Sequence, residues 1–233
     1  MAIRALDRGG LDPYLKGAKM MAPLAVGDLI DGIAFGVLAA ASMGSVAPVV
    51  MSILAFSGSA QFATASVLQE HGTVATAAVA ALAVNSRYLV MGLTLAPVMR
   101  GGPVRRLLQT QFLTDASWAF TQQEEEGKVE RMIGAGFMSR LAWTLGTVAG
   151  VFGAAQLLAQ LGGLERLGLD AVYPAFFLYL LMESLGEDGS HLVAAVTAAG
   201  VALLLVPVLP VGLPVLGAAA VGVLVGWLLQ RRR

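Results

Sequence analysis

Two polar interruptions within apolar stretches are the part of this sequence best suited to chemistry. The first, FSGSAQ, places the hydroxyl groups of Ser57 and Ser59 on either side of the flexible Gly58. The amide of Gln61 follows two residues later. A helix broken inside a bilayer leaves backbone N–H and C=O groups unpaired, and transporters use such groups to bind anionic ligands. The sequence therefore predicts an unwound substrate-binding segment at 57–61, with an intact helix of back-bonded serines as the alternative.

The second interruption, NSRY, lies in the next apolar stretch. Asn85 and Tyr88 offer hydrogen-bonding groups, and Arg87 carries a permanent charge in a fork that suits carboxylates. A pair of interrupted apolar segments is the best sequence indication of a transporter site. We therefore expect Asn85, Arg87 and Tyr88 to bind substrate together with the first interruption. Arg87 has a structural alternative, an ion pair with Asp115.

Other charged residues also lie within apolar stretches, where each costs roughly 2.5–3.5 kcal/mol at mid-bilayer. Asp28 and Asp31 are three residues apart and share a helix face. This pair suits proton coupling, or else lies near the membrane surface, solvated or paired with Lys16 or Lys19. We expect Arg140 to pair with an acid or to extend toward the interface, with a ligand role as the alternative. The candidates for coupling or charge pairing are Asp28, Asp31, Asp115 and Arg140.

The composition explains why lipid is the expected solvent. Of 233 residues, 57% are hydrophobic and 13% are charged, against about 25% charged in soluble domains. Basic and acidic residues number 15 each, and no long basic patch exists, so nucleic acid is not an expected partner. The sequence has no cysteine, and its two histidines are isolated, so we predict no metal site and no cofactor.

The apolar stretches predict an all-α integral membrane protein, because a spanning helix needs about 20 mostly apolar residues. We expect a single polytopic bundle of about seven or eight segments, the second and third interrupted near mid-membrane. Residues 1–21 would form a cytoplasmic N-terminal segment, 22–229 the transporter domain and 230–233 a basic tail. Gly32 and Gly36 form a GxxxG pattern that predicts close helix packing. The expected segments are residues 22–43, 47–69, 73–97, 107–122, 132–161, 170–186 and a proline-divided pair within 191–229.

The charges leave two topologies open. If every segment spans, both termini lie inside, but Arg100, Arg105 and Arg106 lie outside, against the positive-inside tendency. If the second segment is re-entrant, that basic cluster moves inside and the C-terminus moves outside.

The motifs FSGSAQFATASVL, VNSRYLVMGLTLAP, FLTDASWAF and LGLDAVYPAFFLYLL, in this order, resemble the AzlC family. This family forms the large subunit of two-component branched-chain amino acid exporters. The resemblance implies a multi-pass carrier of the bacterial inner membrane that exports valine, leucine and isoleucine, driven by protons. It also implies a small AzlD-type membrane subunit as partner. The family motifs GSAQ, N-x-R-H/Y and TD fall on residues 58–61, 85–88 and 114–115.

Two positions depart from the family pattern. Ala116 stands where the family commonly continues TDE, and Asp31 stands where an apolar residue or proline is expected. Both leave the coupling ion and the substrate open. Our hypothesis is a secondary exporter without enzymatic activity. The alternatives are a passive pore or scaffold subunit and, less favoured, an intramembrane serine protease, since SGSA lacks the GxSG order and His191 begins a helix at the membrane edge.

Overall fold

In the computed structural model, the residues described are 10–121, 127–161, 178, 181–182, 189–209 and 213–231. All regular secondary structure in these ranges is helical. The chain divides into two compact units, which we describe separately. Unit 1 comprises Met1–Ala40, Gly44–Gly58 and Asn85–Gln156, and unit 2 comprises Ala41–Met43, Ser59–Val84 and Leu157–Arg233.

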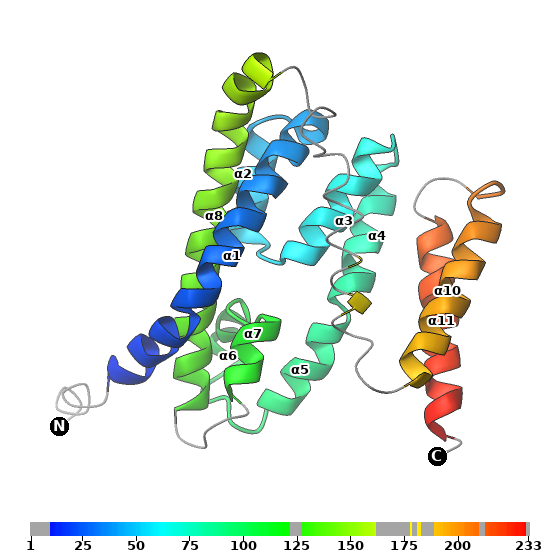
Figure 1. Cartoon of the computed structure of the whole chain (residues 1–233). Helices are drawn as coiled ribbons and strands as arrows, with labels where there is room; N and C mark the ends of the chain where they lie inside the picture. Colours follow the sequence, from blue (N-terminus) through cyan, green and yellow to red (C-terminus); the bar gives the residue numbers. More distant parts are fainter. Residues whose placement is uncertain are drawn as a thin grey trace. The chain divides into compact units, whose positions relative to one another are not determined.

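Unit 1 is built around two long helices, α1 and α8, with four shorter helices beside them (Figure 1). Its helices are α1 (Asp12–Met43), α2 (Val46–Leu54), α5 (Arg87–Leu95), α6 (Pro103–Thr110), α7 (Asp115–Thr121) and α8 (Lys128–Leu161). Unit 2 holds nearly all of α3 (Gly58–Gln69) and α4 (Val74–Asn85), together with α10 (Gly189–Leu205) and α11 (Leu213–Arg231).

Helices α1 and α8 pack closely because glycines remove the side chains between them. A β-carbon at Gly32 would meet the carbonyl oxygen of Trp143, and one at Gly36 would meet that of Thr147. In return, Gly150 of α8 lies against the carbonyl oxygen of Ile33. The close packing predicted for Gly32 and Gly36 is confirmed.

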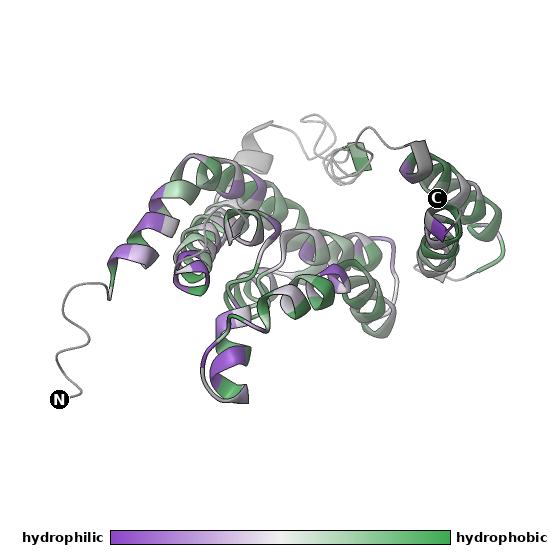
Figure 2. Ribbon diagram, turned by 90° about the horizontal axis from the view of Figure 1, so that it is seen from below, coloured by the Kyte–Doolittle hydropathy of each residue, from purple (hydrophilic) through white to green (hydrophobic). Residues whose placement is uncertain are grey.

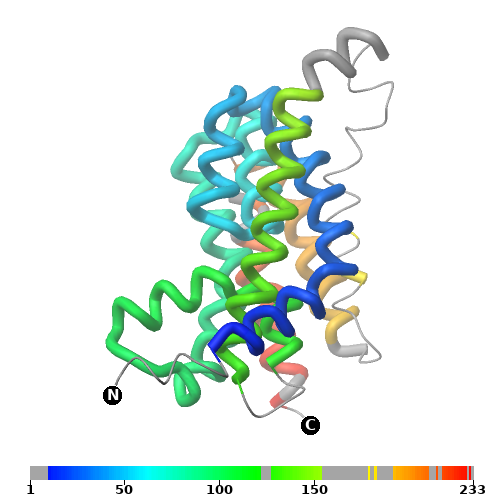
Figure 3. The backbone as a smooth tube through the Cα atoms, turned by 90° about the vertical axis from the view of Figure 1, so that its left-hand side faces the viewer, coloured from blue at the N-terminus to red at the C-terminus, as the bar shows by residue number. Residues whose placement is uncertain are grey.

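The same contacts show that α1 and α8 run parallel and side by side (Figures 1 and 3). Gly17, near the start of α1, lies against Arg131, near the start of α8. Further along, the hydroxyl group of Ser139 donates to the carboxylate of Asp28 at 2.6 Å. Contacts therefore advance along both helices in the same direction.

Two helix boundaries differ from those of the predicted segments, and local signals explain both. Helix α1 begins at Asp12 rather than at residue 22, because an acidic residue followed by proline favours the first turn of a helix. The stretch 107–122 is two helices rather than one. Thr114 and Ser117 exchange hydrogen bonds at the start of α7, where each backbone N–H donates to the other's hydroxyl oxygen, at 2.7 and 3.0 Å. This reciprocal cap starts a new helix.

In unit 2, the helices form hairpins. Val67 of α3 packs against Ala77 and Ala80 of α4 in a small core. Helices α10 and α11 contact each other, and hydrophobic residues predominate on this pair beside the C-terminus (Figure 2). The predicted division of 191–229 into two helices is confirmed, with Pro207 in the turn after α10. The predicted segment 170–186 lies largely outside the described residues.

The number of membrane spans stays a prediction. Of the described helices, α1 is long and apolar enough to cross a membrane, and α4 and α5 make a second such span if they count as one. Helices α10 and α11 contain shorter apolar stretches, His191–Leu205 and Gly217–Leu229.

One end of unit 1 collects basic residues from distant parts of the sequence. Leu95, Met99 and Leu113 share a core with Val129 and Met132 at the start of α8. The connection that carries Arg100, Arg105 and Arg106 therefore lies at the end where α1 and α8 begin. If α1 and α8 cross a membrane, this end is cytoplasmic by the positive-inside rule, and one of the two interrupted segments is re-entrant.

This topology can be tested by cysteine labelling, since the chain has no cysteine of its own. Arg105→Cys and Lys16→Cys should react with an impermeant maleimide only from the cytoplasmic side. Ser45→Cys, in the turn between α1 and α2, should react only from the opposite side. Labelling of Arg105→Cys and Ser45→Cys from the same side would contradict the arrangement.

The helix contact predicts a difference between two neighbouring glycines. Gly32→Ala should lower the free energy of unfolding by about 1–3 kcal/mol, because the added methyl group overlaps the backbone of α8. Gly27→Ala is the matched control, since a β-carbon there meets nothing within 4 Å. Thermal unfolding of the purified protein, followed by tryptophan fluorescence, compares the two. Equal melting temperatures would contradict the close contact.

Candidate functional site

The chain leaves helical geometry between α2 and α3, at Ala55, Phe56 and Ser57. The interruption therefore comes slightly earlier than the predicted stretch 57–61. Gly58 begins α3, so Ser59 and Gln61 lie in its first turn rather than in unwound chain. The prediction of a break at this motif is confirmed, and its predicted extent is wrong.

Residues in the middle of helix α8 stabilise this break. The hydroxyl group of Thr144 donates to the carbonyl oxygen of Ser52 at 3.4 Å, and the hydroxyl groups of Ser52 and Thr147 are 3.0 Å apart. A carbonyl near the end of α2 thereby gains a partner that the interrupted helix does not supply. The indole of Trp143 packs directly over Gly58, where a β-carbon would lie 2.8 Å from the ring.

The second interruption lies at Ser86, between α4 and α5, as NSRY predicted. Asn85 ends α4 and Arg87 begins α5. The hydroxyl group of Ser57 donates to the side-chain oxygen of Asn85 at 2.6 Å. The two polar interruptions, 28 residues apart in sequence, thus meet in unit 1.

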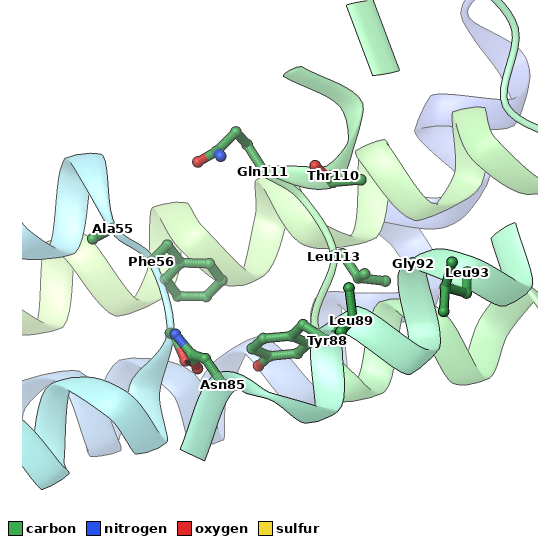
Figure 4. Close-up of a pocket in the computed structure, with 11 residues that line it drawn as sticks. Ala55, Phe56, Asn85, Tyr88, Leu89, Gly92, Leu93, Thr110, Gln111 and Leu113 are labelled. Atoms are coloured by element: carbon green, nitrogen blue, oxygen red, sulfur yellow. Dashed lines mark hydrogen bonds between the residues drawn. The ribbon is translucent and has the colours of Figure 1, made fainter. Parts of the chain in front are cut away.

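A pocket of ≈ 560 Å³ opens where these interruptions meet. Figure 4 shows Phe56, Asn85 and Tyr88 near one another, with Leu89, Leu93 and Leu113 further along the pocket. This volume falls within the range of small-molecule sites, which combine apolar walls with a few polar groups. The lining residues are Ala55, Phe56, Ser57, Asn85, Tyr88, Leu89, Gly92, Leu93, Thr110, Gln111 and Leu113.

Arg87 takes the structural alternative in this conformation. Its Nη2 atom lies 2.8 Å from Oδ2 of Asp115, at the start of α7. The hydroxyl group of Tyr88 points to the same carboxylate oxygen at 3.5 Å. Asp115 is therefore linked to the pocket through Tyr88, and the guanidinium of Arg87 has a counter-ion.

Four of the remaining predicted residues, Asp28, Asp31, Ser59 and Gln61, are not among the lining residues of the pocket. Asp28 is bonded to Ser139 at the contact of α1 and α8. Asp31 is partly buried three residues further along α1. Ser59 and Gln61 are buried in α3, in unit 2. Among the residues that the structure describes, no group of three histidine, aspartate or glutamate side chains could hold a metal ion.

Comparison with known proteins places this arrangement in a family. Residues 23–157, more than half of the chain, match the family model described as AzlC protein. The chain belongs to the AzlC family. It is similar to the inner membrane protein YgaZ of Escherichia coli (strain K12), with 28% identity over 218 residues and 85% of each chain covered. It is also similar to the branched-chain amino acid transport protein AzlC of Bacillus subtilis (strain 168), with 26% identity over 187 residues.

The second alignment covers 78% of this chain and 71% of the relative. No solved structure matches the chain significantly. In this AzlC-family protein, the matched region includes α2 to α7, and hence both interruptions and the whole pocket lining.

Sequence reasoning missed several residues of the pocket in this AzlC-family protein. Phe56, Thr110 and Gln111 line it, although none was predicted to be a site residue. Phe56 directly precedes the SGSAQ motif, so the aromatic neighbour of the break was a usable signal. Thr110 and Gln111 were hidden because the sequence predicted unbroken helix there.

The contact between Trp143 and Gly58 predicts a stability effect. Gly58→Ala should lower the free energy of unfolding by about 1–3 kcal/mol, because the methyl group displaces a buried indole. Gly92→Ala is the control, since a β-carbon there has open space around it. Denaturant unfolding with tryptophan emission as the signal measures both. A Gly58→Ala protein as stable as Gly92→Ala would contradict the packing.

Proposed function

We propose that this chain is a secondary transporter that exports branched-chain and other small neutral amino acids across the bacterial inner membrane. The observation that carries the proposal is the meeting of two interrupted helices at one pocket, where Ser57 bonds to Asn85. Interrupted helix pairs form the substrate sites of many secondary transporters, since unwound backbone and helix ends supply polar groups at mid-membrane.

The pocket walls support a ligand with one polar and one aliphatic end. Ser57, Asn85 and Tyr88 offer hydrogen-bonding groups at the interruptions, and leucine side chains line the part further along (Figure 4). Membership of the AzlC family supports amino acid transport, and the Bacillus subtilis relative is named for branched-chain substrates. We therefore assign substrate binding to this pocket, and we assign no catalytic residue and no cofactor.

Proton coupling and a small AzlD-type membrane subunit belong to the proposal because the resemblance implies both. Of the acidic candidates, Asp115 has the better position for coupling, since Tyr88 approaches its carboxylate and also lines the pocket. Asp28 bonds to Ser139 between α1 and α8, which suits a structural role. Gln61 and Ser59 would act through α3 rather than as pocket walls.

Transport of labelled leucine tests the function directly. The chain is expressed alone and together with a small AzlD-type membrane subunit, and efflux from energised cells is followed with and without an uncoupler. We expect saturable, uncoupler-sensitive efflux against the leucine gradient. Dissipation of the gradient without saturation would instead favour the passive pore, the alternative that polar interruptions also allow.

The pocket assignment predicts the effect of filling it. Gly92→Phe should reduce leucine transport at least about tenfold, because a phenyl ring would clash with the bound ligand. Stability should be retained, since a β-carbon at Gly92 meets nothing within 4 Å. Gly27→Phe, equally open but on α1 and outside the lining, is the control. Wild-type transport rates in Gly92→Phe would remove the pocket from the mechanism.

A further inference from the structure

Arg140 of α8 contacts two of the residues that line the pocket. Its guanidinium carbon is 5.5 Å from the ring centroid of Phe56 and 5.2 Å from that of Phe112. Its Nη2 atom donates to the carbonyl oxygen of Gln111 at 2.7 Å. Phe56 and Gln111 both line the pocket. The charge of Arg140 is therefore held beside the cavity by two of the cavity's own residues.

The position of this guanidinium follows from the face that α8 presents. Gly136, Arg140 and Thr144 are four residues apart and form one stripe along the helix. Gly136 allows the backbone of Phe112 to approach, which brings the neighbouring Gln111 carbonyl to Arg140. Thr144 bonds to the end of α2 at the break. This stripe is the side of α8 that faces the pocket walls.

Arg140 differs from Arg87 in its electrostatic partners. Arg87 pairs with Asp115 at 2.8 Å, whereas among the described residues no carboxylate lies within ion-pair distance of Arg140. The Nε atom of Arg140 is buried without a hydrogen-bond partner in this part of the chain. Aromatic faces attract a cation but do not neutralise it, and intramembrane charges normally pair. The charge and the Nε donor of Arg140 would therefore both be satisfied by one anionic group.

We propose that Arg140 binds the carboxylate of the transported amino acid. This assignment rests on the proposed function and deepens it. The planar guanidinium, held between Phe56 and Phe112, presents N–H groups in a fork that fits a carboxylate. The aliphatic side chain of the ligand would then extend along Leu89 and Leu113. Arg87 keeps its place in the ion pair with Asp115.

Binding to the full chain in nanodiscs, together with a small AzlD-type subunit, tests the assignment. Labelled leucine is displaced by unlabelled leucine or by leucinamide, which retains the side chain and the ammonium group but lacks the carboxylate. Loss of a charge-assisted hydrogen bond should make leucinamide about 10- to 100-fold weaker on the wild type. In Arg140→Gln, the affinity for leucine should fall to that for leucinamide, and the affinity for leucinamide should not change.

Two further variants serve as a control and as a second test. Arg105→Gln, an exposed arginine on α6, should keep the wild-type preference for leucine. Arg140→Lys keeps the charge but loses the fork, so its preference for leucine should be intermediate, and it provides the measurement if Arg140→Gln does not fold. An unchanged preference in the folded Arg140 variants would overturn the assignment alone. Absence of leucine binding to the wild type would overturn the proposed function and the assignment together.

Discussion

An interrupted helix must find partners for its last carbonyl groups, and the structure of unit 1 depends on how α2 meets this requirement. In the interior of a bilayer, where water is scarce, such a partner has to come from protein. Thr144 supplies it by donating to the Ser52 carbonyl, and the Ser52–Thr147 hydroxyl pair fixes α2 against the same helix. Helix α2 therefore stays bonded to α8 although the chain leaves helical geometry just after it, at residues 55–57.

Helix α8 can serve as this support because its faces are specialised. Ser139, Trp143 and Thr147 recur every four residues and contact α1 or α2. The neighbouring stripe of Gly136, Arg140 and Thr144 faces the break and the loop before α7. Small residues on α1 let the two long helices approach until backbones touch. Helix α8 thus packs against α1 on one face and contacts residues of the pocket on another.

The two interruptions could be predicted from residue types, but the partners of the two arginines, Arg87 and Arg140, could not. Polar residues in apolar stretches correctly indicated both interruptions, because their cost in a bilayer makes them informative. The Thr114–Ser117 cap was also readable, although the apolar residues around it favoured one continuous helix. The contacts of Arg140 were not, since cation–aromatic contact and the Gln111 carbonyl depend on chain crossings that sequence spacing does not reveal. Whether Arg87 bound a ligand or Asp115 was likewise a question of distance.

The residues that stabilise the first break are made at different times during synthesis. Ser52 and Thr147 are separated by 95 residues, so α2 leaves the ribosome well before α8 exists. At roughly 5–20 residues per second, this interval is on the order of 5–20 s. Helices α2, α3, α4 and α5 have 9, 12, 12 and 9 residues, each too short to cross a bilayer unaided. If α2 lies within a bilayer, its Ser52 carbonyl needs water as a partner until α8 has been made, so the arrival of α8 limits when α2 can take its final place.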